Sequence, residues 1–149
     1  GTEYLRIALT FFILGLGMGL TMAPSTTMVM DSIPEDKAGV GSATNDASRE
    51  VGGALGIAIG GSVLNEIYQN NLIVPEGLET YSSIATESFP AAMRIGGQLL
   101  GENNMLGFEL IDNARIAFME GMVGSAMVSA GVAFITALLV KFYMPGKTK

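Results

Sequence analysis

Two residue types that carry much of protein chemistry are missing from this chain of 149 residues, which has no cysteine and no histidine. Without cysteine there is no disulfide and no thiolate metal site, and the redox compartment is not indicated. Without histidine the chain lacks the commonest metal ligand and the commonest general base. P-loop, zinc and nucleophile-elbow motifs are also missing from the sequence. We therefore expect no metal site, no cofactor and no enzymatic activity.

Charged residues are scarce as well. They make up 15% of the chain, whereas soluble domains contain about 25%. The formal net charge is −6, and this argues against nucleic-acid binding, which needs basic patches.

The few charges are distributed so that two long stretches have none. One runs from Ile7 to Met30 and the other from Gly121 to Val140. A helix that crosses a bilayer needs roughly 20 mostly apolar residues, whereas a soluble helix of that length would need a polar face. Both stretches are therefore expected to span a membrane. The first is too long for a signal peptide and lacks a basic leader, and Pro24 is expected to kink it.

A second span is expected between these two. Its uncharged run, from Val51 to Leu64, is shorter than the roughly 20 residues that a bilayer requires. The helix must therefore extend back to Gly41. This extension places a polar cluster on the first turns of a membrane helix, near one interface. Its members are Asn45, Asp46, Arg49 and Glu50.

The expected fold is an all-α membrane protein with three transmembrane helices, at about residues 4–30, 41–64 and 120–142. A short turn at 31–38 joins the first two, and a long polar loop at 65–116 precedes the last. Within that loop Ala91 to Leu100 could form a short helix. The tail carries Lys141, Lys147 and Lys149 without an acid, so the C-terminus and the turn are expected in the cytoplasm and the loop outside.

The polar cluster supports two interpretations. Charged residues inside a membrane helix are costly, which favours a role in proton or substrate coupling. Near a helix end, however, long side chains can reach the headgroups and act only as an anchor. Asp46 and Arg49 are three residues apart, so they are neighbours on the helix surface and could pair.

A glycine stripe follows the cluster, at Gly52, Gly56 and Gly60, with Gly53 beside it. Small residues four apart let another helix approach closely, and packing contacts then hold the two helices together. We expect a helix-packing face, and sliding along this face during a transport cycle is a compatible second interpretation.

These segments resemble a known family over Gly15 to Val63. The resemblance lies in a glycine-rich span with Pro24, a turn of sequence I-P-E-D-K-A-G, and then G-S-A-T-N-D-A-S-R-E-V-G-G-A-L-G-I-A-I-G-G-S-V. This pattern is similar to the C-terminal part of drug:proton antiporters of the major facilitator superfamily, in the fourteen-helix EmrB/QacA-type branch. The approach from Arg115 to Gly121 and the apolar span after it fit the last helix of that branch.

The resemblance implies that the chain is the C-terminal fragment of a multi-pass transporter of the bacterial cell membrane. Its partners would be the lipid bilayer, the missing N-terminal helices, a small lipophilic substrate and the proton. Such proteins export lipophilic, often cationic compounds in exchange for protons by alternating access. The positions that match the family pattern are Asn45, Arg49, Gly52, Gly53, Gly56 and Gly60, whereas Glu50 stands where the family commonly has glutamine.

Two other hypotheses remain open. The chain could come from an exporter of the same fold that moves lipids, siderophores or an amphipathic antibiotic. It could also be a small three-span scaffold or interaction protein. Because the first residue is Gly1 and not methionine, we expect a cut inside a longer protein.

Overall fold

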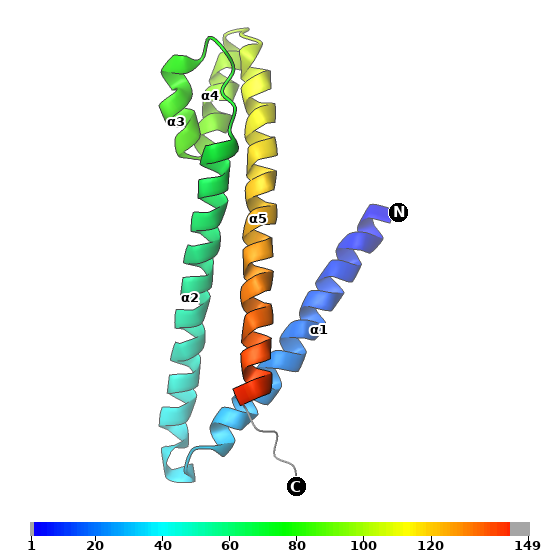
Figure 1. The fold of residues 1–149 in the computed structure, drawn as a ribbon, viewed down its shortest axis with the longest axis vertical. Helices are drawn as coiled ribbons and strands as arrows, with labels where there is room; N and C mark the ends of the chain where they lie inside the picture. Colours follow the sequence, from blue (N-terminus) through cyan, green and yellow to red (C-terminus); the bar gives the residue numbers. More distant parts are fainter. Residues whose placement is uncertain (1, 144–149) are drawn as a thin grey trace. The chain divides into compact units, whose positions relative to one another are not determined.

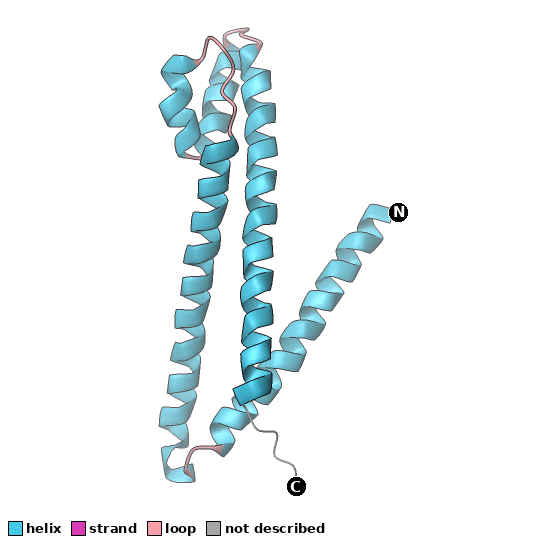
Figure 2. Cartoon of the chain, viewed as in Figure 1, coloured by secondary structure: helices cyan, strands magenta, loops and turns pink. Residues whose placement is uncertain are grey.

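A computed structural model describes residues 2–143, and within that range the chain consists of helices joined by loops, without a strand (Figure 2). Three of the helices are long and apolar enough to cross a membrane: α1 (Thr2–Asp31), α2 (Ala38–Asn71) and α5 (Leu106–Tyr143). The prediction of an all-α membrane protein with three spans is confirmed. The basic tail from Met144 onward lies outside the described residues.

The chain divides into two compact units, residues Gly1–Ala54 and Leu55–Lys149. The first unit contains α1, the single-turn helix η1 (Glu35–Lys37) and the beginning of α2. The side chain of Ile33 packs directly on the buried Gly41, where a Cβ atom would collide with it. This contact fixes the turn between α1 and α2.

The second unit contains the rest of α2, then η2 (Glu79–Tyr81), α3 (Ser82–Glu87), α4 (Phe89–Gly101) and α5. Here the structure differs from the polar loop expected at 65–116. Helix α2 continues to Asn71, α5 already begins at Leu106, and α4 contains the short helix expected from Ala91 to Leu100. We call residues 65–120 the cap (Figure 1).

The cap is helical because it has a hydrophobic core of its own. The largest fully buried side chains are Tyr68 from α2, Leu78 from the loop before η2, and Leu110 from α5. The Tyr68 hydroxyl donates a hydrogen bond of 2.9 Å to the carbonyl oxygen of Ala85 in α3. Phe89 of α4 stacks on Phe118 of α5, with ring centroids 4.4 Å apart. The acidic residues of the segment that was expected to be a loop therefore lie on the outside of a packed helical bundle.

Helices α4 and α5 cross at two glycines. A Cβ atom added to Gly107 would lie 2.5 Å from the carbonyl oxygen of Gly96. The two backbones are thus in direct contact, and only residues without a side chain fit at the crossing.

Helices α2 and α5 also pack closely against each other next to the cap. A Cβ atom on Gly121 would lie 2.7 Å from the carbonyl oxygen of Leu64, and the Ile67 side chain packs on Gly124. The Ser125 hydroxyl donates a hydrogen bond of 2.9 Å to the Gly60 carbonyl oxygen. Small residues allow this approach, as expected for helices packed in a membrane.

The turn before η2 contains an acid with a shifted pKa. The Glu79 carboxylate accepts a hydrogen bond of 2.9 Å from the backbone N–H of Gly77, a glycine with a φ of +94°. This bond, together with one from the backbone N–H of Glu79 itself, lowers the pKa of the carboxyl group below its ordinary value of 4.5. Hydrogen bonds to a charged carboxylate have this effect because they favour the ionised form.

We expect the Glu79 contact to stabilise the turn at neutral pH and to be lost in acid. Because the folded pKa is lowered, its contribution is present above the unfolded pKa and disappears as the pH falls through the folded value. In an NMR titration the Gly77 amide proton should shift with a midpoint below 4.5, the ordinary value. The shift should be missing from Glu79→Gln, and a midpoint at or above the ordinary value would contradict this account.

Candidate functional site

The side chain of Arg49 connects α2 to α1 within the first unit. One terminal nitrogen, Nη2, donates to the Thr26 hydroxyl at 2.5 Å and to the Met22 carbonyl oxygen at 3.3 Å. The Thr26 hydroxyl in turn donates to the same Met22 carbonyl, at 3.0 Å. The hydroxyl thus accepts from the guanidinium and uses its only proton to donate to the backbone.

The segment of α1 around Pro24 is rich in oxygen atoms that can accept hydrogen bonds. Proline has no N–H, so the Leu20 carbonyl loses its usual partner one turn earlier, although the helix continues through Pro24. Hydroxyl groups are concentrated in the same segment, and each bonds to a carbonyl of its own helix. They belong to Thr21, Ser25, Thr26 and Thr27. This segment is therefore a polar patch on an otherwise apolar helix.

The hydrogen bonds of Arg49 go to neutral oxygens of α1, and the pair with Asp46 that the spacing allows stays a prediction. Neutral acceptors orient a guanidinium but leave its charge uncompensated. Asp46 and Glu50 are exposed, and Asn45 is half-buried. The roles of Thr26 and Met22 were missed, although the hydroxyl-rich sequence beside Pro24 could have indicated them.

The glycine stripe continues along the face of α2 that carries Arg49. Residues spaced by three or four share one face of a helix, and Arg49, Gly52, Gly56 and Gly60 follow this spacing. Among the described residues, and apart from the adjacent backbone of α2 itself, no atom lies within 4 Å of a Cβ atom added at Gly52, Gly53 or Gly56. A Cβ atom added at Gly60 would meet the Ser125 side chain. A packing face at the first three positions stays a prediction.

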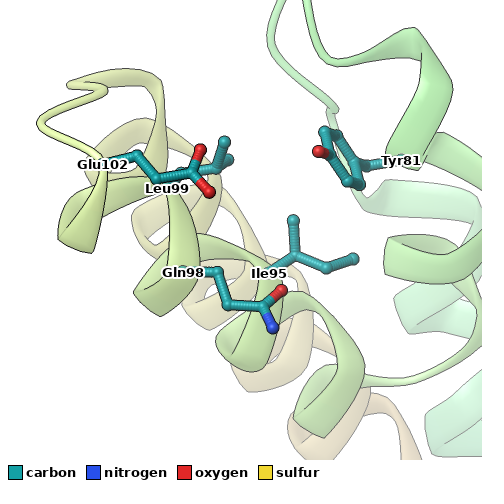
Figure 3. Close-up of a pocket in the computed structure, with 5 residues that line it drawn as sticks. All are labelled: Tyr81, Ile95, Gln98, Leu99 and Glu102. Atoms are coloured by element: carbon teal, nitrogen blue, oxygen red, sulfur yellow. The ribbon is translucent and has the colours of Figure 1, made fainter.

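One small pocket lies in the cap, between η2 and α4 (Figure 3). Its lining residues are Tyr81, Ile95, Gln98, Leu99 and Glu102, and its volume is about 30 Å³. A space of this size admits only a few water molecules, so this pocket does not accommodate a drug-sized compound. Residues 2–143 also contain no cluster of three or more metal-ligating side chains.

Similar proteins are known among bacterial drug-resistance proteins. The chain is 30% identical to the multidrug efflux pump LfrA of Mycolicibacterium smegmatis over 135 residues, which are 90% of this chain and 26% of that protein. It is 30% identical to the methyl viologen resistance protein SmvA of Salmonella typhimurium over 72% of this chain and 21% of that protein. It is 38% identical to the multidrug resistance protein Stp of Mycobacterium tuberculosis, over 42% of this chain and 12% of that protein.

These similarities cover only part of each relative. No protein-family model and no solved structure matches the chain. The chain spans about a quarter of the length of LfrA and about a fifth of SmvA. Within that part, it is a membrane protein homologous to multidrug efflux and multidrug resistance proteins.

Proposed function

We propose that the chain is the C-terminal part of a drug:proton antiporter of the major facilitator superfamily, in the fourteen-helix EmrB/QacA-type branch. The observation that carries the proposal is the similarity to LfrA along 90% of the chain. The name of SmvA adds that this relative confers resistance to methyl viologen, an organic cation. The substrate class proposed here is accordingly lipophilic or cationic compounds, exported across the bacterial cell membrane in exchange for protons.

The depth of the polar cluster in the membrane supports a role in transport. The uncharged run of α5 begins at Gly121, which contacts Leu64 of α2. Leu64 therefore marks one hydrocarbon boundary on α2. A bilayer core is about 30 Å thick, or roughly 20 helical residues, so the other boundary on α2 falls near Asn45. Asp46, Arg49 and Glu50 then lie just inside the hydrocarbon layer.

Charged residues within a membrane-spanning segment are rare because they are costly to bury, and they therefore indicate a functional site by default. In the proposed mechanism Arg49 is a fixed cation, held by Thr26 and the Met22 carbonyl. Asp46 and Glu50, on the same helix, are the groups that would exchange protons or meet a cationic substrate. Transport would follow the superfamily scheme, in which two helix bundles rock about a central cavity.

The proposed activity is tested in bacteria that express the full-length protein and are loaded with a fluorescent lipophilic cation. We expect energised cells to export the dye and a protonophore to stop the export. Cells that carry the empty vector are the control. Dye retention equal to that control, at verified membrane expression, would reject the exporter, and export that persists with the protonophore would reject proton coupling.

The proposed topology places the C-terminus in the cytoplasm and the cap outside. Ser83 in α3 is exposed, and the chain has no cysteine of its own. In an otherwise cysteine-free full-length protein, Ser83→Cys should react with an impermeant maleimide in intact cells. A cysteine at Asp36, in the turn before α2, should react only after lysis. The reverse pattern would show that the orientation is inverted.

A further inference from the structure

Polar side chains bind α2 to α5 at several levels near the cap. The Ser125 hydroxyl donates to the Gly60 carbonyl, as described above. Farther along, the Asn71 side-chain amide donates to the Glu120 carboxylate at 2.6 Å. The Asn113 amide of α5 donates to the Ile73 carbonyl, just beyond the end of α2, at 2.9 Å. Two of these bonds join α2 directly to α5, and the third joins α5 to the segment just after α2. A shift along the helix axis would strain all three.

Backbone contacts lie between these bonds. Gly121 rests on the Leu64 carbonyl, and Gly124 receives the Ile67 side chain. Close contacts of this kind oppose displacement of one helix against the other, because a densely packed interface leaves little room for side chains to move. Helices in lipid gain no hydrophobic energy by associating, so close packing and polar bonds determine how they pair.

The cap closes over the same pair of helices. Its core contains Tyr68 from α2 and three residues of α5, Leu110, Ala114 and Ala117, together with the residues of the segment that joins the two helices. Separation of α2 from α5 at this end would therefore open a packed core to water, besides breaking the bonds between the helices.

We infer that the ends of α2 and α5 next to the cap, from Gly60 on α2 and up to Ser125 on α5, form a fixed joint. The two helices stay in contact there throughout the transport cycle. The inference rests on the proposed function and deepens it. The exporter opens and closes elsewhere, and the cap moves together with α2 and α5 as one body. The interpretation of the glycine stripe as a sliding face then does not apply at Gly60.

A disulfide across the joint tests this inference. A Cβ atom at Gly60 would lie 3.1 Å from the Ser125 oxygen, so cysteines at these two positions are within reach of a disulfide. The double variant Gly60→Cys with Ser125→Cys is made in the otherwise cysteine-free full-length exporter and measured for dye efflux before and after reduction. We expect equal efflux rates in the oxidised and reduced states. A loss of efflux that reduction restores would overturn the fixed joint.

A second measurement covers the case in which the cysteine pair disturbs folding. Spin labels are placed at the exposed positions Gln69 and Met122 of the full-length protein. The distance between them should not change when substrate is added or the pH is altered, and a change of about 5 Å, the pitch of one helical turn, would overturn the inference. A wild-type protein that exports no dye would count against the proposed function, whereas the label distance tests the joint by itself.

Discussion

Replacement of Gly107 by alanine is expected to destabilise the cap strongly. The new methyl group would lie 2.5 Å from the Gly96 carbonyl oxygen. Because that atom belongs to the backbone of α4, the clash can be relieved only if the two helices move apart. Overpacking of this kind costs about 1–3 kcal/mol. The change should appear as a lower unfolding temperature of the purified protein in detergent.

Gly97 is the matched control for this experiment. It lies in α4 directly after Gly96, yet a Cβ atom there has no neighbour within 4 Å. Alanine is favoured over glycine in a helix interior by about 0.5–1 kcal/mol, so Gly97→Ala should leave the unfolding temperature unchanged or raise it. Equal destabilisation by both substitutions would show that α4 and α5 do not cross at Gly96 and Gly107.

Replacement of Arg49 by alanine is expected to reduce dye efflux by roughly tenfold or more. Hydrogen bonds to charged groups contribute about 1.5–3 kcal/mol, and a loss of about 1.4 kcal/mol from the rate-limiting state corresponds to a tenfold slower rate. Arg49→Lys keeps the charge but replaces the planar guanidinium by a compact ammonium group, so it should retain part of the activity. Efflux is compared at matched expression.

Thr26 provides a finer test of the same contact. Thr26→Val keeps the shape and removes the oxygen that accepts from Arg49, so it should lower efflux, whereas Thr26→Ser should restore it. Thr27→Val is the control, because the Thr27 hydroxyl bonds to the Ala23 carbonyl of its own helix. Wild-type efflux from both Arg49→Ala and Thr26→Val would reduce Arg49 to an interfacial anchor.

The membrane-spanning part of the fold could be predicted from the sequence. The uncharged runs at Ile7–Met30 and Gly121–Val140 correspond to α1 and α5, and the short run before Leu64 correctly required α2 to begin earlier. Length and charge suffice for such helices, because the bilayer imposes a long apolar segment on each of them.

The cap was not predictable in the same way. Its core residues Tyr68, Leu78 and Leu110 are far apart in the sequence, and α3 is only 6 residues long. Short helices give little periodic signal, so the segment was predicted as a polar loop. The partners of Arg49 were also hidden, because they lie 23 and 27 residues away on another helix. A charged residue in a membrane helix indicates that it needs a hydrogen-bonding partner, but the sequence does not show which neutral group on another helix fills that role.

The central claim is that this chain belongs to an exporter that exchanges a lipophilic cation for protons. Its most direct test uses the purified full-length protein in liposomes that contain a pH-sensitive dye. When a gradient of the organic cation is imposed, the account predicts proton movement in the opposite direction, and a much smaller movement with Arg49→Ala. Cation transport without proton movement, or no transport by a correctly folded protein, would contradict it.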